Sequence, residues 1–196
     1  APVADLEQSI SSPGGYVLDS KPGIFEDVVL LDFKSLYPSI IRTFHVDPLA
    51  MIVASEESDP IPGFKESQFS RDNYILPEII ENLWDARDQA KKLKKTAMSQ
   101  AIKIIMNSFY GVMGTTGCRF FDPKLASSIT LRGHEILQTT RNLLEKKGFP
   151  VIYGDTDSVF VHLKGTSDVD QTALELVTYL NTVSYTHLTL PTSYAV

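Results

Sequence analysis

The sequence predicts an α+β fold in which an antiparallel sheet is packed with helices. Residues 28–31 (VVLL) form a short apolar run rich in β-branched side chains, which is typical of a buried strand. Residues 149–163 (FPVIYGDTDSVFVHL) predict a strand, a tight turn and a second strand. Between these two regions, residues 77–110 carry apolar side chains at helical spacing. Together these three stretches give the predicted fold class.

Four helices are expected. The first begins at Pro77, where Glu78 and Glu81 suit the positive end of the helix dipole. The second covers roughly residues 98–110. The two would form an antiparallel hairpin if the chain breaks near residues 96–99, but that break is weakly marked and one long kinked helix stays open. A third helix runs from residue 122 to Gly148, and a fourth from about 169 to 181. The apolar stripe expected on the first helix is Ile79, Leu83, Ala86, Ala90, Leu93 and Ala97.

The composition is that of an ordinary globular protein. Of 196 residues, 43% are hydrophobic and 21% are charged. No run of about 18 apolar residues occurs, so no membrane association is expected. The first residues, APVADLEQSISSPGG, lack the basic start and apolar core of a signal peptide. The single cysteine, Cys118, cannot form an internal disulfide, which fits a reducing cytoplasm.

Charge is distributed unevenly along the chain. The net charge of −6 argues against a simple nucleic-acid-binding domain, because duplex binding usually leaves a basic surface. Residues 87–103 nevertheless hold six basic residues and a single acid, Asp88. Such a basic stripe suits phosphate binding in a protein that holds metal ions with carboxylates elsewhere. On charge alone, a solvated helix face is the simpler interpretation.

Three aspartates lie at the ends of predicted strands. Asp32 ends the strand at residues 28–31, and Asp155 and Asp157 occupy the turn between the later two strands. A carboxylate at the end of a buried strand is held rigidly, and Mg²⁺ commonly takes one or two carboxylates plus substrate phosphates. Two such ions can stabilise both the attacking and the leaving oxygen of a phosphoryl displacement. A Gly-Asp turn also forms without any metal, so this pattern alone leaves both interpretations open.

The helix at residues 98–110 presents two different stripes. Its apolar stripe is Ile102, Ile105, Met106 and Phe109. Lys103, Asn107 and Tyr110 fall on a second stripe, turned by roughly 110° from the first. A cation, an amide and an aromatic ring on one face could hold a triphosphate and stack on a base. Arg87 and Lys91 are neighbours on the preceding helix. An ordinary amphipathic helix pair with a solvated basic face would look the same.

Three longer motifs contain most of these candidate residues. Residues 32–40 (DFKSLYPSI), 103–111 (KIIMNSFYG) and 153–158 (YGDTDS) resemble, in order and spacing, the three polymerase motifs of family B DNA polymerases. The amino-acid sequences of residues 12–33, 39–44 and 114–130 are most similar to the bacterial, repair-associated branch of that family. The resemblance covers roughly residues 10–181. It implies a polymerase palm with an antiparallel sheet and packed helices, plus a helical-hairpin fingers subdomain.

The resemblance also implies a catalytic set. Asp32 and Asp157 would bridge two Mg²⁺ ions, with Mn²⁺ as a substitute. The Phe33 carbonyl would add a ligand, and Asp155 would be a nearby, less direct carboxylate. Lys103 would act on the triphosphate during catalysis. The reaction would be attack of a primer 3′-hydroxyl on the α-phosphorus of a deoxynucleotide, with pyrophosphate leaving.

A second implied set would bind the incoming nucleotide. Backbone N–H groups of Ser35 and Leu36 would contact the triphosphate, and Tyr37 would lie under the sugar and exclude a 2′-hydroxyl. Thr156 and Ser158 would shape the hairpin near the primer end. The expected nucleotide-binding residues are Ser35, Leu36, Tyr37, Arg87, Lys91, Lys103, Asn107, Tyr110 and Gly111.

Partners and location follow from the same resemblance. The expected partners are primer-template DNA and deoxynucleoside triphosphates, and a sliding clamp contacted through regions outside this sequence. The expected location is the bacterial cytoplasm, in association with the nucleoid. Full family members carry an exonuclease before this region and a thumb after it, so the 196-residue chain alone is expected to extend primers poorly or not at all. A two-metal nuclease or phosphatase, and a non-catalytic nucleic-acid-binding segment, are the alternatives.

Four segments are expected along the chain. Residues 1–64 would form the N-terminal part of the palm, with a subdomain boundary near residues 55–63. Residues 65–117 would form the fingers helices, and residues 118–183 the C-terminal part of the palm. Residues 184–196 (SYTHLTLPTSYAV) change character to a Thr-rich stretch without Asp, Glu, Lys or Arg, which suggests foreign or disordered sequence.

Overall fold

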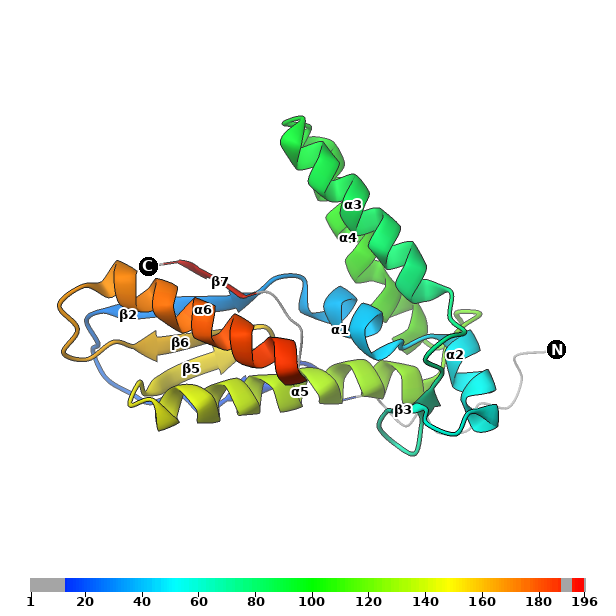
Figure 1. Cartoon of the computed structure of the whole chain (residues 1–196), viewed down its shortest axis with the longest axis horizontal. Helices are drawn as coiled ribbons and strands as arrows, with labels where there is room; N and C mark the ends of the chain where they lie inside the picture. Colours follow the sequence, from blue (N-terminus) through cyan, green and yellow to red (C-terminus); the bar gives the residue numbers. More distant parts are fainter. Residues whose placement is uncertain (1–12, 188–191, 196) are drawn as a thin grey trace. The chain divides into compact units, whose positions relative to one another are not determined.

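The structure, a computed structural model, describes residues 13–187 and 192–195 (Figure 1). The chain forms two compact units. Among the described residues, the hairpin unit comprises 13–14 and Tyr37–Leu131, and the sheet unit comprises Gly15–Leu36, 132–187 and Thr192–Ala195. These units divide the chain differently from the segments expected from sequence, because residues 37–64 and 118–131 group with the helical hairpin.

The sheet unit is built on five strands in the order β1-β5-β6-β2-β7, and all the neighbouring strands are antiparallel. Burial alternates along β2, where Val29, Leu31 and Phe33 face the core. The predicted strand–turn–strand is confirmed in β5 and β6. The strands are β1 (Val17–Leu18), β2 (Val28–Phe33), β5 (Val151–Asp155), β6 (Ser158–His162) and β7 (Thr192–Ala195).

Two helices contribute to the sheet unit. Helix α5 (Pro123–Lys146) begins and ends close to the predicted positions, and its second half belongs to this unit. Helix α6 (Val169–His187) runs across the sheet in Figure 1 and buries Ala173, Leu176 and Leu180. It extends beyond the expected end at residue 181, into the region whose composition suggests foreign or disordered sequence.

The structure describes residues 184–187 and 192–195 of the C-terminal stretch. Residues 184–187 continue α6, and Thr192–Ala195 pair with β2 as strand β7. Residues 188–191 and 196 lie outside the described residues. The foreign origin of residues 184–196 stays a prediction. Within residues 13–187 and 192–195, no helix combines the length and apolar character needed to cross a membrane.

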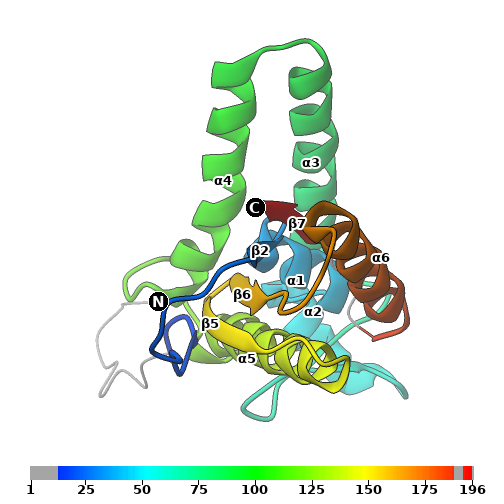
Figure 2. The ribbon, with the colours of Figure 1, turned by 90° about the vertical axis from the view of Figure 1, so that its left-hand side faces the viewer.

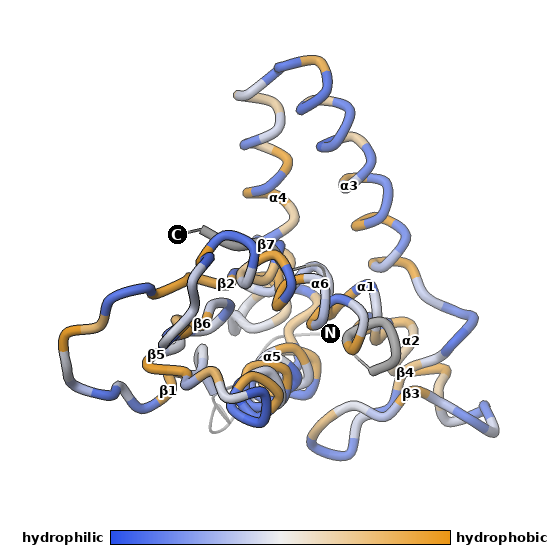
Figure 3. Tube along the Cα trace, turned by 60° about the vertical axis from the view of Figure 1, so that its left-hand side comes forward, coloured by the Kyte–Doolittle hydropathy of each residue, from blue (hydrophilic) through white to orange (hydrophobic). Residues whose placement is uncertain are grey.

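The hairpin unit takes its name from two long antiparallel helices, α3 (Leu76–Lys92) and α4 (Thr96–Gly114), seen in Figure 2. The chain reverses at residues 93–95, where Lys94 adopts a left-handed conformation with φ 54°. A hairpin is therefore present and one long kinked helix is excluded. Figure 3 shows α3 as mostly hydrophilic along its length and α4 as more apolar.

The predicted apolar stripe of α3 was right at Ala90 but displaced by one position at Ile79 and Leu83. Ile80, Trp84 and Ala90 are the buried residues beyond the first turn, whereas Ile79 is 41% exposed and Leu93 is 65% exposed. Stripes through Ile79 and through Ile80 have the same spacing, so periodicity could not choose between them. On α4, Ile102 and Met106 are buried as expected, but Ile105 is exposed.

Short helices and strands complete the hairpin unit, and they were not predicted from the sequence. Helix α1 (Leu36–Phe44) follows β2 directly, and α2 (Pro48–Val53) leads into a 3-10 turn, η1 (Ala54–Glu56). Strands β3 (Ile61–Pro62) and β4 (Gln68–Phe69) form a small separate pair. These elements are too short to produce a clear hydrophobic period.

Candidate active site

The sheet unit brings the beginning of the first motif, residues 32–36, together with the third motif. Asp32 on β2 lies opposite Ser158 on β6 in the antiparallel register. The backbone N–H of Phe33 donates to the carbonyl oxygen of Asp157 at 2.8 Å. Asp32 and Asp157 are half-buried, and Asp155 is exposed. Two acids separated by 125 positions in the sequence therefore sit on directly hydrogen-bonded backbone segments.

The turn that carries Asp155 and Asp157 is tied down by hydrogen bonds. Thr156 adopts a left-handed conformation with φ 50°, and its N–H donates to the Tyr16 carbonyl at 2.8 Å. Its hydroxyl donates to Asp155 Oδ1 at 2.8 Å, and the Ser158 hydroxyl donates to the Asp155 carbonyl at 3.3 Å. Part of the Asp155 carboxylate is thus used inside the turn, and the less direct role expected for this residue stays a prediction.

Strand β1 supports this turn, and sequence reasoning missed it. Val17 pairs with Asp155 and Leu18 with Gly154. A side chain at Gly154 would lie 2.6 Å from Leu18 Cδ1, so only glycine fits there without movement. The Ser, Pro and Gly of residues 9–27 favour turns and hide the strand. A two-residue strand gives no local signal, because it exists only through its pairing with β5.

The donor set fits a hard divalent cation. In the part of the chain that the structure describes, no three His, Cys, Asp or Glu side chains gather as a metal-binding group. Mg²⁺ does not need three, because it usually combines one or two carboxylates with water and substrate phosphates. Asp32 and Asp157 are oxygen donors on paired backbone segments, and the expected Phe33 carbonyl belongs to the same pair. The residues present therefore suit Mg²⁺ in chemical type.

The hairpin unit carries most of the residues expected to bind nucleotide. We call Lys103, Asn107 and Tyr110 of α4 the nucleotide face. Lys103 and Asn107 are exposed, and Tyr110 is half-buried. The Tyr110 ring lies 4.8 Å, centroid to centroid, from the ring of Tyr37 on α1. Tyr110 of the second motif thus contacts Tyr37 of the first motif within the hairpin unit.

The other expected nucleotide-binding residues are distributed as follows. Arg87 and Lys91 lie on α3, where the Lys91 ammonium is 3.4 Å from Asp88 Oδ1. A side chain at Gly111 would meet no atom within 4 Å. Ser35 and Leu36 follow β2 in the sheet unit, and Ser35 is left-handed with φ 51°. Ser35 and Leu36 thus belong to the sheet unit, and the other expected nucleotide-binding residues belong to the hairpin unit.

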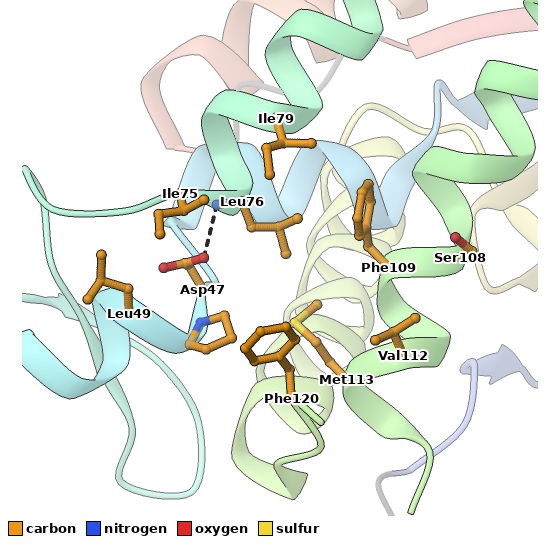
Figure 4. A pocket seen from close by; sticks show the side chains of 11 residues that line it. Asp47, Leu49, Ile75, Leu76, Ile79, Ser108, Phe109, Val112, Met113 and Phe120 are labelled. Atoms are coloured by element: carbon orange, nitrogen blue, oxygen red, sulfur yellow. Dashed lines mark hydrogen bonds between the residues drawn. The ribbon is translucent and has the colours of Figure 1, made fainter. Parts of the chain in front are cut away.

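An apolar pocket of about 360 Å³ lies in the hairpin unit, beside α2 and the facing parts of α3 and α4 (Figure 4). Its one carboxylate, Asp47, is 2% exposed, and its Oδ1 accepts from the Leu76 N–H at 2.9 Å. The lining contains none of the expected nucleotide-binding residues, so the pocket is not the candidate site. The lining residues are Asp47, Pro48, Leu49, Ile75, Leu76, Ile79, Ser108, Phe109, Val112, Met113 and Phe120.

Comparison with known proteins agrees with this geometry. The model of the family described as DNA polymerase family B matches residues 4–191. DNA polymerase II of Escherichia coli (strain K12) is 55% identical over 166 residues, which cover 83% of this chain and 21% of that protein. The DNA polymerase of Thermococcus gorgonarius is 36% identical over 187 residues, which cover 87% of this chain and 24% of that protein.

A solved structure of a family B DNA polymerase has a similar fold. The family B DNA polymerase from the archaeon Pyrobaculum calidifontis matches with a TM-score of 0.69 and 26% identity, covering 95% of this chain and 26% of that chain. The chain thus spans about a fifth of the length of the bacterial relative and about a quarter of the Pyrobaculum structure. The resemblance carried by the three motifs and the expected α+β fold are both confirmed: the chain belongs to DNA polymerase family B.

Proposed function

We propose that this chain supplies the nucleotidyl-transfer site of a DNA-directed DNA polymerase. The observation that carries the proposal is the 2.8 Å hydrogen bond from the Phe33 N–H to the Asp157 carbonyl oxygen, which joins the backbone next to Asp32 to the backbone of Asp157. In the proposed reaction, the primer 3′-oxygen forms a bond to the α-phosphorus of a deoxynucleoside triphosphate. The bond from that phosphorus to the bridging oxygen breaks, pyrophosphate leaves, and the hydroxyl proton is lost to solvent.

Asp32 and Asp157 would hold two Mg²⁺ ions, with Mn²⁺ as a substitute, assisted by the Phe33 carbonyl. When bound, the two ions would supply Lewis-acid activation of the 3′-hydroxyl and neutralise charge on the triphosphate. Asp155 would support the turn through Thr156 and add negative charge nearby. The protein's own contribution is to fix the carboxylates before substrate arrives, because catalysis of this kind depends on positioning and preorganised charge.

The hairpin unit would bind the nucleotide. Arg87, Lys91 and Lys103 would grip the triphosphate, because guanidinium and ammonium groups form short charge-assisted hydrogen bonds with phosphate oxygens. Ser35 and Leu36 would add backbone N–H donors. Tyr37 would lie under the sugar and exclude a 2′-hydroxyl, while Asn107, Tyr110 and Gly111 would line the new base pair. The Tyr37–Tyr110 ring contact supports this arrangement, because it joins the sugar-facing and base-facing residues.

Primer-template DNA would be the second substrate. A clamp contact and a nucleoid-associated location in the bacterial cytoplasm stay predictions. We also propose that the isolated chain extends primers weakly, because phosphate contacts made elsewhere in a longer polymerase supply much of the affinity for duplex DNA.

Two alternative functions use the same acids. A two-metal nuclease or phosphatase has no use for Tyr37 or for the nucleotide face, and a non-catalytic DNA-binding segment has no use for paired carboxylates. Nucleotide binding separates the proposal from both. We expect the purified chain to bind 2′-deoxyadenosine 5′-triphosphate in the presence of Mg²⁺ and to lose binding when EDTA removes the ion.

The matched variants are Asp157→Ala, which removes a proposed ligand, and Asp170→Ala, which removes an exposed acid on α6. Isothermal titration calorimetry should show affinity reduced at least tenfold by the first and unchanged by the second. Equal affinities for the unaltered chain and Asp157→Ala would sink the proposed role of that carboxylate.

A further inference from the structure

Helix α1 contacts both helices of the hairpin. Near its beginning, Tyr37 packs its ring 4.8 Å from that of Tyr110 on α4. In its last turn, Arg42 reaches α3, where its Nη1 lies 2.9 Å from Glu81 Oε2. The guanidinium carbon of Arg42 also lies 4.8 Å from the centre of the Trp84 ring. One nine-residue helix therefore connects the first motif to both arms of the hairpin.

The Arg42 contact is more than an exposed ion pair. Exposed pairs hold their partners only weakly, because water and salt compete for both charges. Trp84, however, is only 7% exposed, so the guanidinium lies against a ring that is itself fixed by packing. Glu81 and Trp84 are three positions apart and thus neighbours on the surface of α3. Contact with both fixes the rotation of α3 about its own axis, which one contact alone would not do.

That rotation determines where two proposed phosphate-binding cations point. At 100° per residue, Trp84, Arg87 and Lys91 fall within about 60° of one another around α3. Side-chain tips lie about 5–6 Å from a helix axis, so a 20° rotation would displace them by about 2 Å. Lys91 interacts with Asp88 of the same helix, so this ion pair does not anchor α3 to any other element. Displacements of this size are enough to impair the alignment of a bound substrate.

We propose that Arg42 is a positioning residue for the triphosphate: by contacting Glu81 and Trp84 it sets the rotation of α3, and so the direction of Arg87 and Lys91. This role rests on the proposed function, because it concerns the same nucleotide. Arg42 itself touches neither substrate nor metal. Its planar guanidinium makes an ion pair and a ring contact at once, which a lysine ammonium does not reproduce.

The test measures the affinity of the 196-residue chain for 2′-deoxyadenosine 5′-triphosphate with Mg²⁺ by calorimetry. Arg42→Gln should weaken binding about tenfold, Arg42→Lys by a smaller factor, and Glu81→Gln by a smaller factor again because the Trp84 contact stays. Arg71→Gln is the matched control, because Arg71 pairs with Asp59 at 3.2 Å in the segment that precedes α3. Trp84 is the chain's only tryptophan, so its fluorescence reports directly whether the Arg42 contact is lost.

A second measurement separates positioning from general loss of structure. If Arg42 acts through Arg87, Arg42→Gln should have a clearly smaller effect in an Arg87→Gln background than alone. Equal effects in both backgrounds, or affinity within twofold of the unaltered chain although Trp84 fluorescence changes, would overturn the positioning role. If the unaltered chain fails to bind the triphosphate at all, the proposed function fails first, and the positioning role falls with it.

Discussion

At the scale of single residues, the proposed position of Tyr37 under the sugar makes its contact with Tyr110 testable through substrate choice. A ring held by a neighbouring ring resists displacement, so it can exclude a larger sugar by steric clash. In a polymerase that carries this segment, Tyr37→Ala should raise ribonucleotide incorporation relative to deoxynucleotide incorporation by at least about tenfold, which corresponds to about 1.4 kcal/mol. Single-nucleotide incorporation assays with both triphosphates measure this ratio.

The control is Tyr37→Phe, which keeps the ring and removes only the hydroxyl. It should keep the discrimination of the unaltered segment. If Tyr37→Phe relaxed discrimination as much as Tyr37→Ala, a hydrogen bond of the hydroxyl rather than the bulk of the ring would be responsible.

Asp47 is a second residue with a measurable role, in stability rather than chemistry. Its two carboxylate oxygens accept from the backbone N–H of Ala50 in α2 and of Leu76 in α3, both at 2.9 Å. Asp47→Ala would leave both buried donors without their partner, at a cost of about 2–5 kcal/mol in the free energy of unfolding. Urea unfolding followed by Trp84 fluorescence reports on this unit. Asp72→Ala, at an exposed acid, should change stability by less than about 0.5 kcal/mol.

At the scale of elements, the turn between β5 and β6 depends on close packing with β1. A methyl group at Gly154 would lie 2.6 Å from Leu18 Cδ1 and 3.1 Å from the Ser158 carbonyl oxygen. Gly154→Ala should therefore push β1 away, destabilise the sheet by about 1–3 kcal/mol and speed amide hydrogen exchange in β5 and β6. Gly14→Ala, where an added methyl meets no atom within 4 Å, is the matched control. Unchanged exchange in Gly154→Ala would show that the strands yield without cost.

Local patterns predicted the long elements well. The helices expected to begin at Pro77 and after Asp122 have a proline in the first turn and a helical period, and both are present as α3 and α5. The apolar stripe of α3 was partly misplaced, because packing against α4 decides which stripe is buried, and the helical period of α3 itself carries no information on that packing. Strand β1 and the Arg42 contact with α3 were not predictable from local sequence, since each exists only through a distant partner.

The residues of the candidate site were also predictable from local sequence only in part. Strand-end positions made Asp32, Asp155 and Asp157 candidates only, and the register of β2 and β6 places Asp32 opposite Ser158, next to Asp157. Their catalytic roles came from the family resemblance and stay proposals. The roles of the nine nucleotide-binding residues came from the family resemblance, and they stay proposals. Helical spacing alone predicted that Lys103, Asn107 and Tyr110 share a face of α4. The spacing of residues does not show whether that face binds a triphosphate.

At the scale of the whole molecule, the chain spans about a fifth of the bacterial polymerase it resembles. Its activity is therefore best measured inside that longer relative. A chimaera in which residues 13–183 replace the matching segment of Escherichia coli DNA polymerase II keeps the surrounding protein and tests only this segment. The isolated chain should extend a primer far more slowly than the chimaera, because it makes fewer phosphate contacts with the duplex. Processive extension by the isolated chain would contradict this.

The most direct test of the central claim is single-nucleotide incorporation by that chimaera with and without Asp157→Ala, with Asp170→Ala as control. We expect the chimaera to extend the primer, Asp170→Ala to leave the rate unchanged, and Asp157→Ala to lower the rate by about 10³-fold or more, equivalent to roughly 4 kcal/mol of transition-state stabilisation. Incorporation by the Asp157→Ala chimaera at the rate of the unaltered one would contradict the proposal that Asp32 and Asp157 carry the nucleotidyl transfer.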